Sequence, residues 1–284
     1  VDVFFTISGF LIINLLITEY EKNANNHNGY GWVSLPAFYL RRARRLIPGA
    51  IFVLTITTIY AQVSFNHEKA MSVMFDGIYA FFFTAHWPIQ LKTDYFQRGF
   101  AQSPFEHFWS LSVEEQFYLI VPCLFLITVY MHGLKIGKLK LSWYRRIYIL
   151  MSSVVISSFA YSVFLVSVSP TSAYFSSLTR AWEIGMGGLL SLFLRRHKLL
   201  MQKWAWNLIS IFGFVAITIA SIFFNANTRF PGLNALVPVL SVMAIITAGS
   251  VHQANLVSKF LSQKVFTAIG RISYSVYLWY LSIL

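Results

Sequence analysis

Long apolar stretches separated by short polar connections constrain the fold of this chain more than any other feature. A helix needs about 20 mainly apolar residues to cross a lipid bilayer. The chain offers nine candidates near that length, at residues 1–18, 46–64, 70–88, 113–131, 147–168, 178–194, 205–224, 233–250 and 265–284. Only 11% of the 284 residues are charged, whereas soluble proteins carry about 25%. We therefore predict an all-α integral membrane protein, a polytopic helical bundle.

The third apolar segment, 70–88, differs from the others because polar residues interrupt it. It contains Asp76 and Gly77 and ends in Pro88. If it does not cross the bilayer, 16 of the 22 Lys and Arg residues fall on one side; if it crosses, the basic residues divide 9 against 12. The positive-inside rule favours the first arrangement, which predicts about eight spanning helices and one re-entrant or interfacial segment. Residues 65–112 then form a long external connection.

The net charge of +12 does not by itself indicate a nucleic-acid partner. The basic residues stand in short runs between apolar segments, as expected of membrane topology signals. The single cysteine, Cys123, excludes an intrachain disulfide, and the seven histidines lack the spacing typical of zinc sites. We expect membrane lipids as neighbours, no nucleic acid, and no bound metal or cofactor.

A run of arginines precedes the second apolar segment, in the stretch FYLRRARRLIP. On a helix Arg41, Arg44 and Arg45 share one face, and we place this face toward the cytosol. Guanidinium groups bind phosphate through paired hydrogen bonds, so this run, with Arg42, fits a phosphate-rich ligand such as a nucleotide-bearing acyl donor. The alternative is a topological anchor that contacts anionic lipid headgroups.

Two glutamates follow a histidine near the start of the fourth apolar segment, in the stretch HFWSLSVEEQFY. Ser112 and Glu115 have the spacing of an N-terminal capping box, which gives Glu115 a structural role. Glu114 has no such role, and an ionised carboxylate in a membrane helix is costly without a partner. We name Glu114, Glu115 and His107 as candidate catalytic residues at the outer mouth, with Glu114 acting as a general base or orienting one. The alternative for Glu114 is an ion pair with a neighbouring cation.

Two further stretches place polar groups inside apolar segments. In TRAWEIGMGGLL, Arg180 and Glu183 are three residues apart and predict an ion pair at a helix mouth, while the glycines permit close helix packing. In GRISYSVYLWY, Arg271 can reach the cytosolic interface and the aromatic residues suit an interfacial belt. The Asn- and Gly-rich residues 21–31 predict a flexible loop.

Together these stretches resemble the acyltransferase family 3 membrane proteins, which include O-antigen and peptidoglycan O-acetylases. The matching stretches follow the family's order along the whole chain: VDVFFTISGFLI, FYLRRARRLIP, HFWSLSVEEQFYLIVP, TRAWEIGMGGLL and GRISYSVYLW. The resemblance implies a multi-pass protein of the bacterial inner membrane. It implies transfer of an acyl group, commonly acetyl from cytosolic acetyl-CoA, to a sugar hydroxyl of a cell-surface polysaccharide such as lipopolysaccharide. It also implies functional roles for the arginine run and the acidic pair.

The chain departs from the family pattern in two places. Family members carry a catalytic His in a helix upstream of the first matching stretch, and the usual His after YLW is Tyr280 here. We therefore expect residues 1–284 to be a partial transmembrane domain, truncated at both ends and inactive alone. The stretches SPFEHFWSLSVEEQFY and TRAWE resemble those of family members that continue into an SGNH-hydrolase-like outer domain. The alternative function is a flippase or carrier for lipid-linked glycans, although the paired broken helices typical of transporters are not evident.

Overall fold

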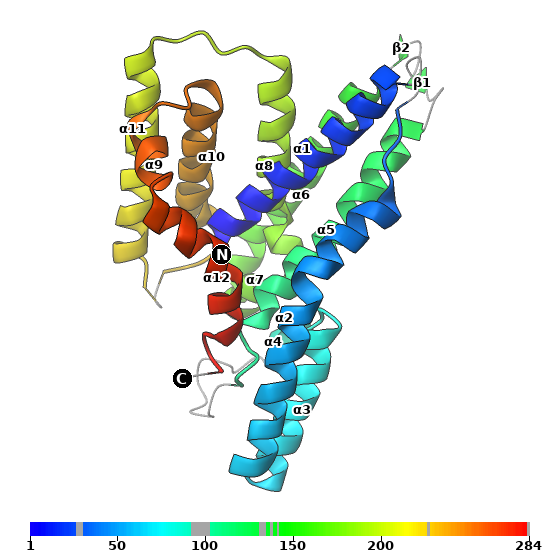
Figure 1. Cartoon of the computed structure of the whole chain (residues 1–284), viewed down its shortest axis with the longest axis vertical. Helices are drawn as coiled ribbons and strands as arrows, with labels where there is room; N and C mark the ends of the chain where they lie inside the picture. The colour runs from blue at the N-terminus through cyan, green and yellow to red at the C-terminus, as the bar shows by residue number, and fades with distance from the viewer. Residues whose placement is uncertain are drawn as a thin grey trace. The chain divides into compact units, whose positions relative to one another are not determined.

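The computed structural model shows a chain built almost entirely of α-helices (Figure 1), and it describes residues 1–26, 31–91, 103–130, 135–136, 139–140, 142–225 and 228–282. The short strands β1 and β2 pair antiparallel. In chain order the elements are α1 (Asp2–Asn26), α2 (Leu35–Ser64), α3 (His67–Phe81), α4 (His86–Leu91), α5 (Phe108–Tyr130), β1 (Lys135–Ile136), β2 (Leu139–Lys140), α6 (Trp143–Val168), α7 (Pro170–Phe175), α8 (Ser177–Arg196), α9 (Lys203–Phe223), η1 (Gly232–Ala235), α10 (Leu236–Val251), α11 (Leu256–Leu261) and α12 (Lys264–Trp279).

Six helical segments among the described residues are long and apolar enough to cross a bilayer: α1, α2, α5, α6, α9, and η1 with α10. These support the predicted multi-pass, all-helical class. Helix α3 has 15 residues and α12 has 16, so at 1.5 Å per residue both are shorter than the roughly 30 Å hydrocarbon core. The count of eight crossings and the re-entrant character of the third segment therefore stay predictions.

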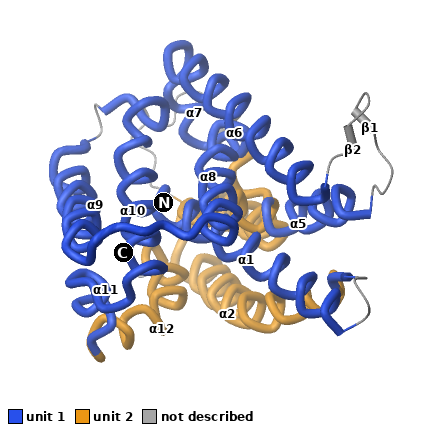
Figure 2. The backbone as a smooth tube through the Cα atoms, turned by 90° about the horizontal axis from the view of Figure 1, so that it is seen from above, with its two compact units in different colours: residues 1–33, 117–263 blue, residues 34–116, 264–284 orange. Residues whose placement is uncertain are grey.

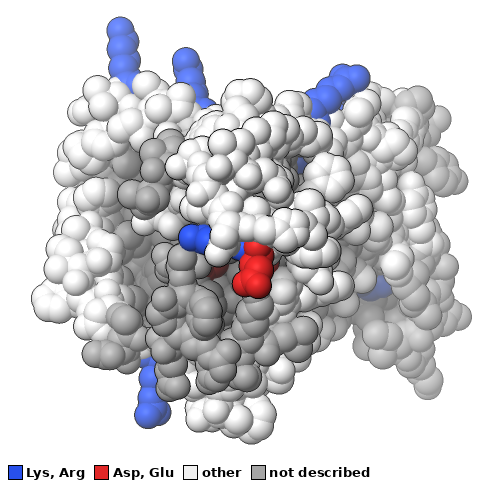
Figure 3. All heavy atoms as spheres, turned by 90° about the horizontal axis from the view of Figure 1, so that it is seen from below, with Lys and Arg blue, Asp and Glu red and all other residues white. Residues whose placement is uncertain are grey.

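The candidate spans leave many large apolar side chains exposed. In α6 and α9 only 22% of the most apolar window is buried inside the protein, and Phe212 and Ile222 of α9 are 75% and 70% exposed. Figure 3 shows that most of the surface visible from one side carries no charged side chain. Such exposure is unfavourable in water and favourable against lipid tails. The surface therefore fits a bilayer as the solvent.

Helix α1 continues through much of the segment 21–31, so the predicted flexible loop is wrong for that part. Arg195 of α8 lies along this end of α1 and contacts three side chains on one face. Its Nη1 contacts Glu21 Oε2 at 2.5 Å, and its Nη2 donates to Asn14 Oδ1 at 2.9 Å and to the Thr18 hydroxyl. One arginine thus stabilises the last turns of α1, which the local composition could not indicate.

The chain forms two compact units (Figure 2). The first contains residues 1–33 and 117–263, and the second contains residues 34–116 and 264–284. Because the boundary falls inside α5, the first turns of this helix belong to the second unit and the remainder to the first. Each unit has its own packing and its own cluster of charged side chains.

In the first unit, glycines let α1 and α8 pack with their backbones in contact. Gly9 of α1 lies against the backbone of Ile184, and Gly187 of α8 lies against the backbone of Thr6. A Cβ atom added at either glycine would overlap the opposing carbonyl group. Small residues at such crossings bring membrane helices close enough for extensive van der Waals contact. The predicted packing role of the glycines in TRAWEIGMGGLL is confirmed at Gly187.

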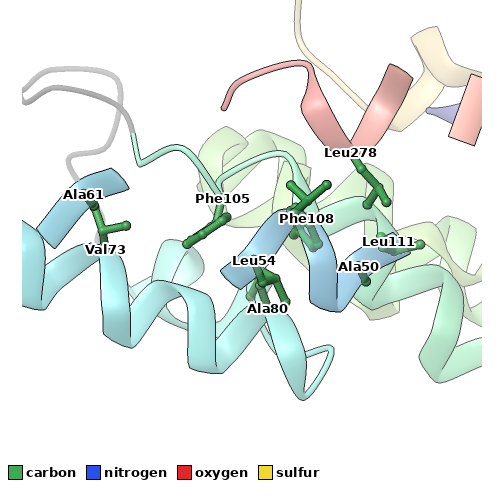
Figure 4. Close-up of a cluster of buried hydrophobic side chains, with 11 residues drawn as sticks. Ala50, Leu54, Ala61, Val73, Ala80, Phe105, Phe108, Leu111 and Leu278 are labelled. Atoms are coloured by element: carbon green, nitrogen blue, oxygen red, sulfur yellow. The ribbon is translucent and has the colours of Figure 1, made fainter. Parts of the chain in front are cut away.

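In the second unit, α2 and α3 form an antiparallel helical hairpin. Ala61 lies beside Val73 at one end of the pair, and Leu54 lies near Ala80 toward the other end (Figure 4). Asn66 starts α3 by accepting a hydrogen bond from the backbone N–H three residues later. The hairpin buries one small-residue face on each helix and leaves the other faces exposed.

The segment before α5 packs onto this hairpin. Gly77 of α3 faces the ring of Phe105, where an added Cβ would approach to 3.1 Å. Phe105 and Phe108 are both 1% exposed and meet edge to face. Leu278 of α12 joins the same apolar cluster (Figure 4). The start of α5 and the end of α12 are thereby fixed against α2 and α3.

Candidate active site

The arginine run lies inside α2 because this helix begins well before the predicted apolar segment. Ser34 caps the helix through its side chain. Arg41, Arg44 and Arg45 are exposed, whereas the side chain of Arg42 is only 21% exposed. The predicted shared face of three arginines is therefore confirmed, and Arg42 points elsewhere. Arg41, Arg44 and Arg45 stay predicted donor-binding residues, and Arg42 belongs to a different arrangement.

Helix α5 begins at Phe108, so Ser112 and Glu115 lie inside it and the predicted capping box is wrong. The Ser112 hydroxyl donates to the Phe108 carbonyl at 2.9 Å and accepts from the backbone N–H of Ala85 at 3.3 Å. The spacing of Ser112 and Glu115 matches a capping box, but the helix has already begun four residues before Ser112. The position of Glu115 must therefore be fixed by a contact other than a capping box.

The residue that makes this contact is Arg42, whose guanidinium group contacts both glutamates. Nε and Nη2 donate to Glu115 Oε1 at 3.0 and 2.7 Å, and Nε lies 3.3 Å from Glu115 Oε2. A longer contact of 3.4 Å joins Nη2 to Glu114 Oε1. The side chains of Glu114 and Glu115 are 18% and 14% exposed. One cation and two carboxylates therefore share a mostly dehydrated place, where each interaction is stronger than in water.

This contact corrects the expectation that the arginine run and the acidic pair lie at opposite mouths of the membrane domain. Side chains that touch at 2.7 Å cannot be separated by a hydrocarbon core of about 30 Å. Counting basic residues assigns connections to sides, but it does not give the depth of a residue within a helix. Arg42 and the glutamates form one site, which we call the Arg42–glutamate cluster.

His107 precedes α5 and is held against α12. Its Nε2 donates to the Leu278 carbonyl at 3.1 Å, which fixes the tautomer because a carbonyl only accepts. The ring is 7% exposed, and burial lowers the pKa of His107 to about 4. Such an imidazole is neutral at pH 7 and is a weak base. His107 stays a predicted catalytic residue, but its contacts are those of a group that anchors two helices.

Glu106, next to His107, is a titratable residue that the sequence reasoning missed. Its Oε2 is buried, and burial together with the nearby charge of Asp76 raises the pKa of Glu106 to about 7. Asp76 lies on α3, so only the packing of the preceding segment onto that helix brings the two carboxyl groups together. No local spacing could have signalled this pair.

A second charged cluster lies in the first unit around Arg180. The predicted ion pair with Glu183 is confirmed at 2.9 Å, and the same nitrogen, Nη1, contacts Asp2 Oδ1 at 2.8 Å. Arg180 and Glu183 are fully buried, and the rings of Tyr174 and Phe230 lie over the guanidinium group. These contacts join α1, α7 and α8 inside the first unit.

The fold and these clusters define a multi-pass helical membrane protein with ionisable groups held inside its helices, a pattern typical of membrane enzymes and transporters. Comparison with known proteins decides between them. The family described as "Acyltransferase domain", acyltransferase family 3, matches residues 1–284. The chain belongs to this family, as its motifs indicated. No solved structure matches it.

Two relatives are similar over the whole chain. The Peptidoglycan O-acetyltransferase OatA of Listeria monocytogenes is 31% identical over 294 residues, which cover 100% of this chain and 44% of the relative. The O-acetyltransferase OatA of Staphylococcus aureus is 30% identical over 292 residues, covering 100% of this chain and 45% of the relative. The chain thus spans less than half the length of these relatives.

Proposed function

We propose that this chain forms the membrane part of an O-acyltransferase that moves an acetyl group from acetyl-CoA to a sugar hydroxyl of the cell-wall glycan. Family membership over residues 1–284 supports an enzyme rather than the carrier or flippase considered above. The relatives named as O-acetyltransferases support acetyl as the group and a hydroxyl as the acceptor. One of them is named for peptidoglycan, so we propose peptidoglycan rather than lipopolysaccharide as the acceptor, at the bacterial inner membrane.

The single observation that carries this proposal is the Arg42–glutamate cluster. A sugar hydroxyl is a poor nucleophile near neutral pH and needs a positioned base. Glu115 is oriented by three contacts with Arg42, whereas Glu114 shares one longer contact. We assign Glu114, whose contact with Arg42 is the longer of the two, to the acceptor hydroxyl, and we assign Glu115 to holding Arg42 in place.

The proposed reaction needs the donor thioester, the acceptor hydroxyl and the Glu114 carboxylate. The hydroxyl oxygen attacks the thioester carbonyl carbon, its proton goes to the Glu114 carboxylate, and the carbon–sulfur bond breaks to release the CoA thiolate. The proton then returns to solvent, or to the thiolate. The exposed face of Arg41, Arg44 and Arg45 is assigned to the phosphates of the donor, since guanidinium groups bind them through paired hydrogen bonds.

The acceptor is tested by chemical analysis of the cell wall. The gene is deleted in its host and restored as wild type or as Glu114→Gln, each expressed from the whole reading frame. Ester-linked acetate is released from purified peptidoglycan by mild alkali and measured. We expect acetate to fall on deletion and to return only with the wild type. Unchanged acetate in the deletion strain would refute this acceptor.

The donor is tested separately in membrane vesicles. Inverted vesicles that contain the protein are incubated with acetyl-CoA labelled in its acetyl group, and label in a glycan acceptor is counted. Free labelled acetate serves as the control. Label that enters the acceptor from acetyl-CoA but not from free acetate supports the donor, whereas equal label from free acetate, or none from acetyl-CoA, would assign the donor to another acyl carrier.

A further inference from the structure

Helix α12 carries the motif ISYSVYLW, to which the proposed function gives no role. Tyr274 and Tyr277 are three residues apart, so they lie on the same face of the helix. Leu278 lies beside them and is 1% exposed, whereas Ile272 and Val276 are 56% and 58% exposed. One face of α12 therefore packs inside the second unit, and the two hydroxyl groups are directed to α2 and to the start of α5.

The first contact of this face is with α2, close to the arginine run. The Tyr274 hydroxyl donates to the Leu46 carbonyl at 2.9 Å. Gly49 leaves room for the contact, since an added Cβ would lie 3.4 Å from the Tyr274 ring and 3.3 Å from Leu278 Cδ1. Leu46 follows Arg42 by one helical turn. The hydroxyl thus fixes the backbone that carries Arg42.

Helix α2 needs such support at this place because Pro48 lies inside it. Proline has no N–H group, so the carbonyl four residues earlier loses its helical hydrogen bond and the helix is weakened locally. The weakened turn begins at Arg44, two residues after Arg42. A donor from another helix is well placed to limit movement there.

The second contact is with the start of α5. The Tyr277 hydroxyl donates to the His107 carbonyl, and the Ser110 hydroxyl donates to Tyr277 at 2.6 Å. His107 returns a hydrogen bond to the Leu278 carbonyl at 3.1 Å. Ser110 precedes Glu114 by one helical turn. Helix α12 is therefore hydrogen-bonded to α2 and to the start of α5, the two helices that carry the Arg42–glutamate cluster.

We propose that α12 is a brace that sets the distance between Arg42 and the glutamates, with Tyr274 as its positioning residue. The Tyr274 hydroxyl bonds the Leu46 carbonyl, one helical turn after Arg42. Its bond to α2 and the Tyr277 bonds to α5 fix the two helices relative to each other. The functional consequence rests on the proposed acyltransferase activity, because it concerns the geometry of that site.

Tyr274→Phe tests the brace, since it removes one hydroxyl and keeps the ring. Tyr60→Phe is the matched control, because Tyr60 lies on α2 and is 60% exposed. The variants are expressed from the whole reading frame and assayed for acetyl transfer. For Tyr274→Phe we expect kcat to fall roughly 10- to 100-fold, with KM for the donor within about twofold of the wild type. Tyr60→Phe should match the wild type.

A packing role alone would reduce the amount of protein and leave the kcat of the folded fraction unchanged, and that result would overturn the proposal. A second measurement does not depend on activity. The apparent Tm in detergent is compared for Tyr274→Phe, Glu115→Gln and the double variant. Residues in one network couple, whereas independent residues add, so we expect a double variant whose Tm falls less than the two single losses combined.

The two measurements separate failure of the brace from failure of the proposed function. If the wild type transfers no acetyl group, the proposed function fails, and the Tm comparison alone judges the brace. Additive Tm losses would overturn the brace even in an active enzyme. Coupled Tm losses together with an unchanged kcat would show that α12 contributes only to stability. That result would also reject Tyr274 as a positioning residue.

Discussion

Glu114 and Glu115 are adjacent in the sequence, but Arg42 holds them differently. Glu115 receives the closest contacts, at 2.7 and 3.0 Å, and Glu114 receives one at 3.4 Å. Truncating a partner of a buried ion pair leaves the other charge without compensation, which is strongly destabilising. Neutralising Glu114 and neutralising Glu115 should therefore have different effects on activity and on the amount of protein.

We expect Glu114→Gln to lose activity by about 100-fold or more while accumulating normally in the membrane, because a proton-transfer group is removed. Glu115→Gln should reduce both the amount of protein and its activity, because Arg42 loses its main partner. Acetyl transfer and immunoblots of membranes measure the two effects. Full activity of Glu114→Gln would exclude Glu114 as the base.

The arginines of α2 should also separate by role. Arg44→Ala and Arg45→Ala remove exposed side chains, so we expect a raised KM for acetyl-CoA with little change in kcat or in membrane insertion. Arg42→Ala should lower kcat instead, because it leaves two buried carboxylates without their cation. Initial rates over a range of donor concentrations distinguish the cases. A raised KM in Arg42→Ala alone would place the donor phosphates at Arg42.

The raised pKa of Glu106 predicts that the stability of the protein depends on pH. Its pKa in the folded protein is raised to about 7, above the ordinary value, so the folded state binds a proton that the unfolded state releases. The stabilisation is full at pH values below the ordinary pKa and is lost as the pH rises through about 7. We expect the apparent Tm of the wild type to fall between about pH 5 and pH 8 by more than that of Glu106→Gln.

The matched control for this pH series is Glu68→Gln, which changes an exposed glutamate in the first turn of α3. It should follow the wild type across the series. Burial lowers the pKa of His107 to about 4, which acts in the opposite direction at acid pH. Comparing each variant with the wild type at the same pH removes this contribution. Parallel curves for Glu106→Gln and the wild type would show that Glu106 titrates normally.

At the scale of the elements, the crossing of α1 and α8 depends on glycines. A Cβ on Gly187 would overlap the Thr6 carbonyl, whereas Gly270 of α12 has nothing within 4 Å of an added Cβ. We expect Gly187→Ala to lower the apparent Tm and the yield, because backbone atoms have to separate. Gly270→Ala should leave the Tm unchanged or raise it, since alanine favours a helix by about 1 kcal/mol over glycine. Equal effects of both substitutions would show that the helices do not cross at Gly187.

At the scale of the whole molecule, the number of crossings depends on α3 and α8. Eight crossings put the connection after α2 outside and the connection between α8 and α9 inside. We expect a topology reporter inserted after Asn66 to be external and one inserted after Lys198 to be cytosolic. The same side for both would contradict this topology. A third reporter after Ser142 then identifies the cause: it matches Asn66 if α3 crosses, and differs if α8 does not.

The sequence by itself determined the features that follow from neighbouring residues. Apolar length predicted the helical membrane class, and helical periodicity predicted the exposed face of Arg41, Arg44 and Arg45 and the pair of Arg180 with Glu183. Family motifs identified the acyltransferase family before any geometry was considered. These inferences succeed because residues three or four apart on a helix are neighbours whatever the fold.

Only the tertiary structure decided which helices meet and at what depth. It paired Arg42 with Glu115 and Asp2 with Arg180, and it directed Tyr274 to α2. It also replaced the supposed capping box with a serine inside α5. Apolar patterns mark which segments enter the membrane, but nearly uniform hydrophobic faces do not specify their partners. Those partners are selected by close packing at small residues and by the few polar groups that need one another.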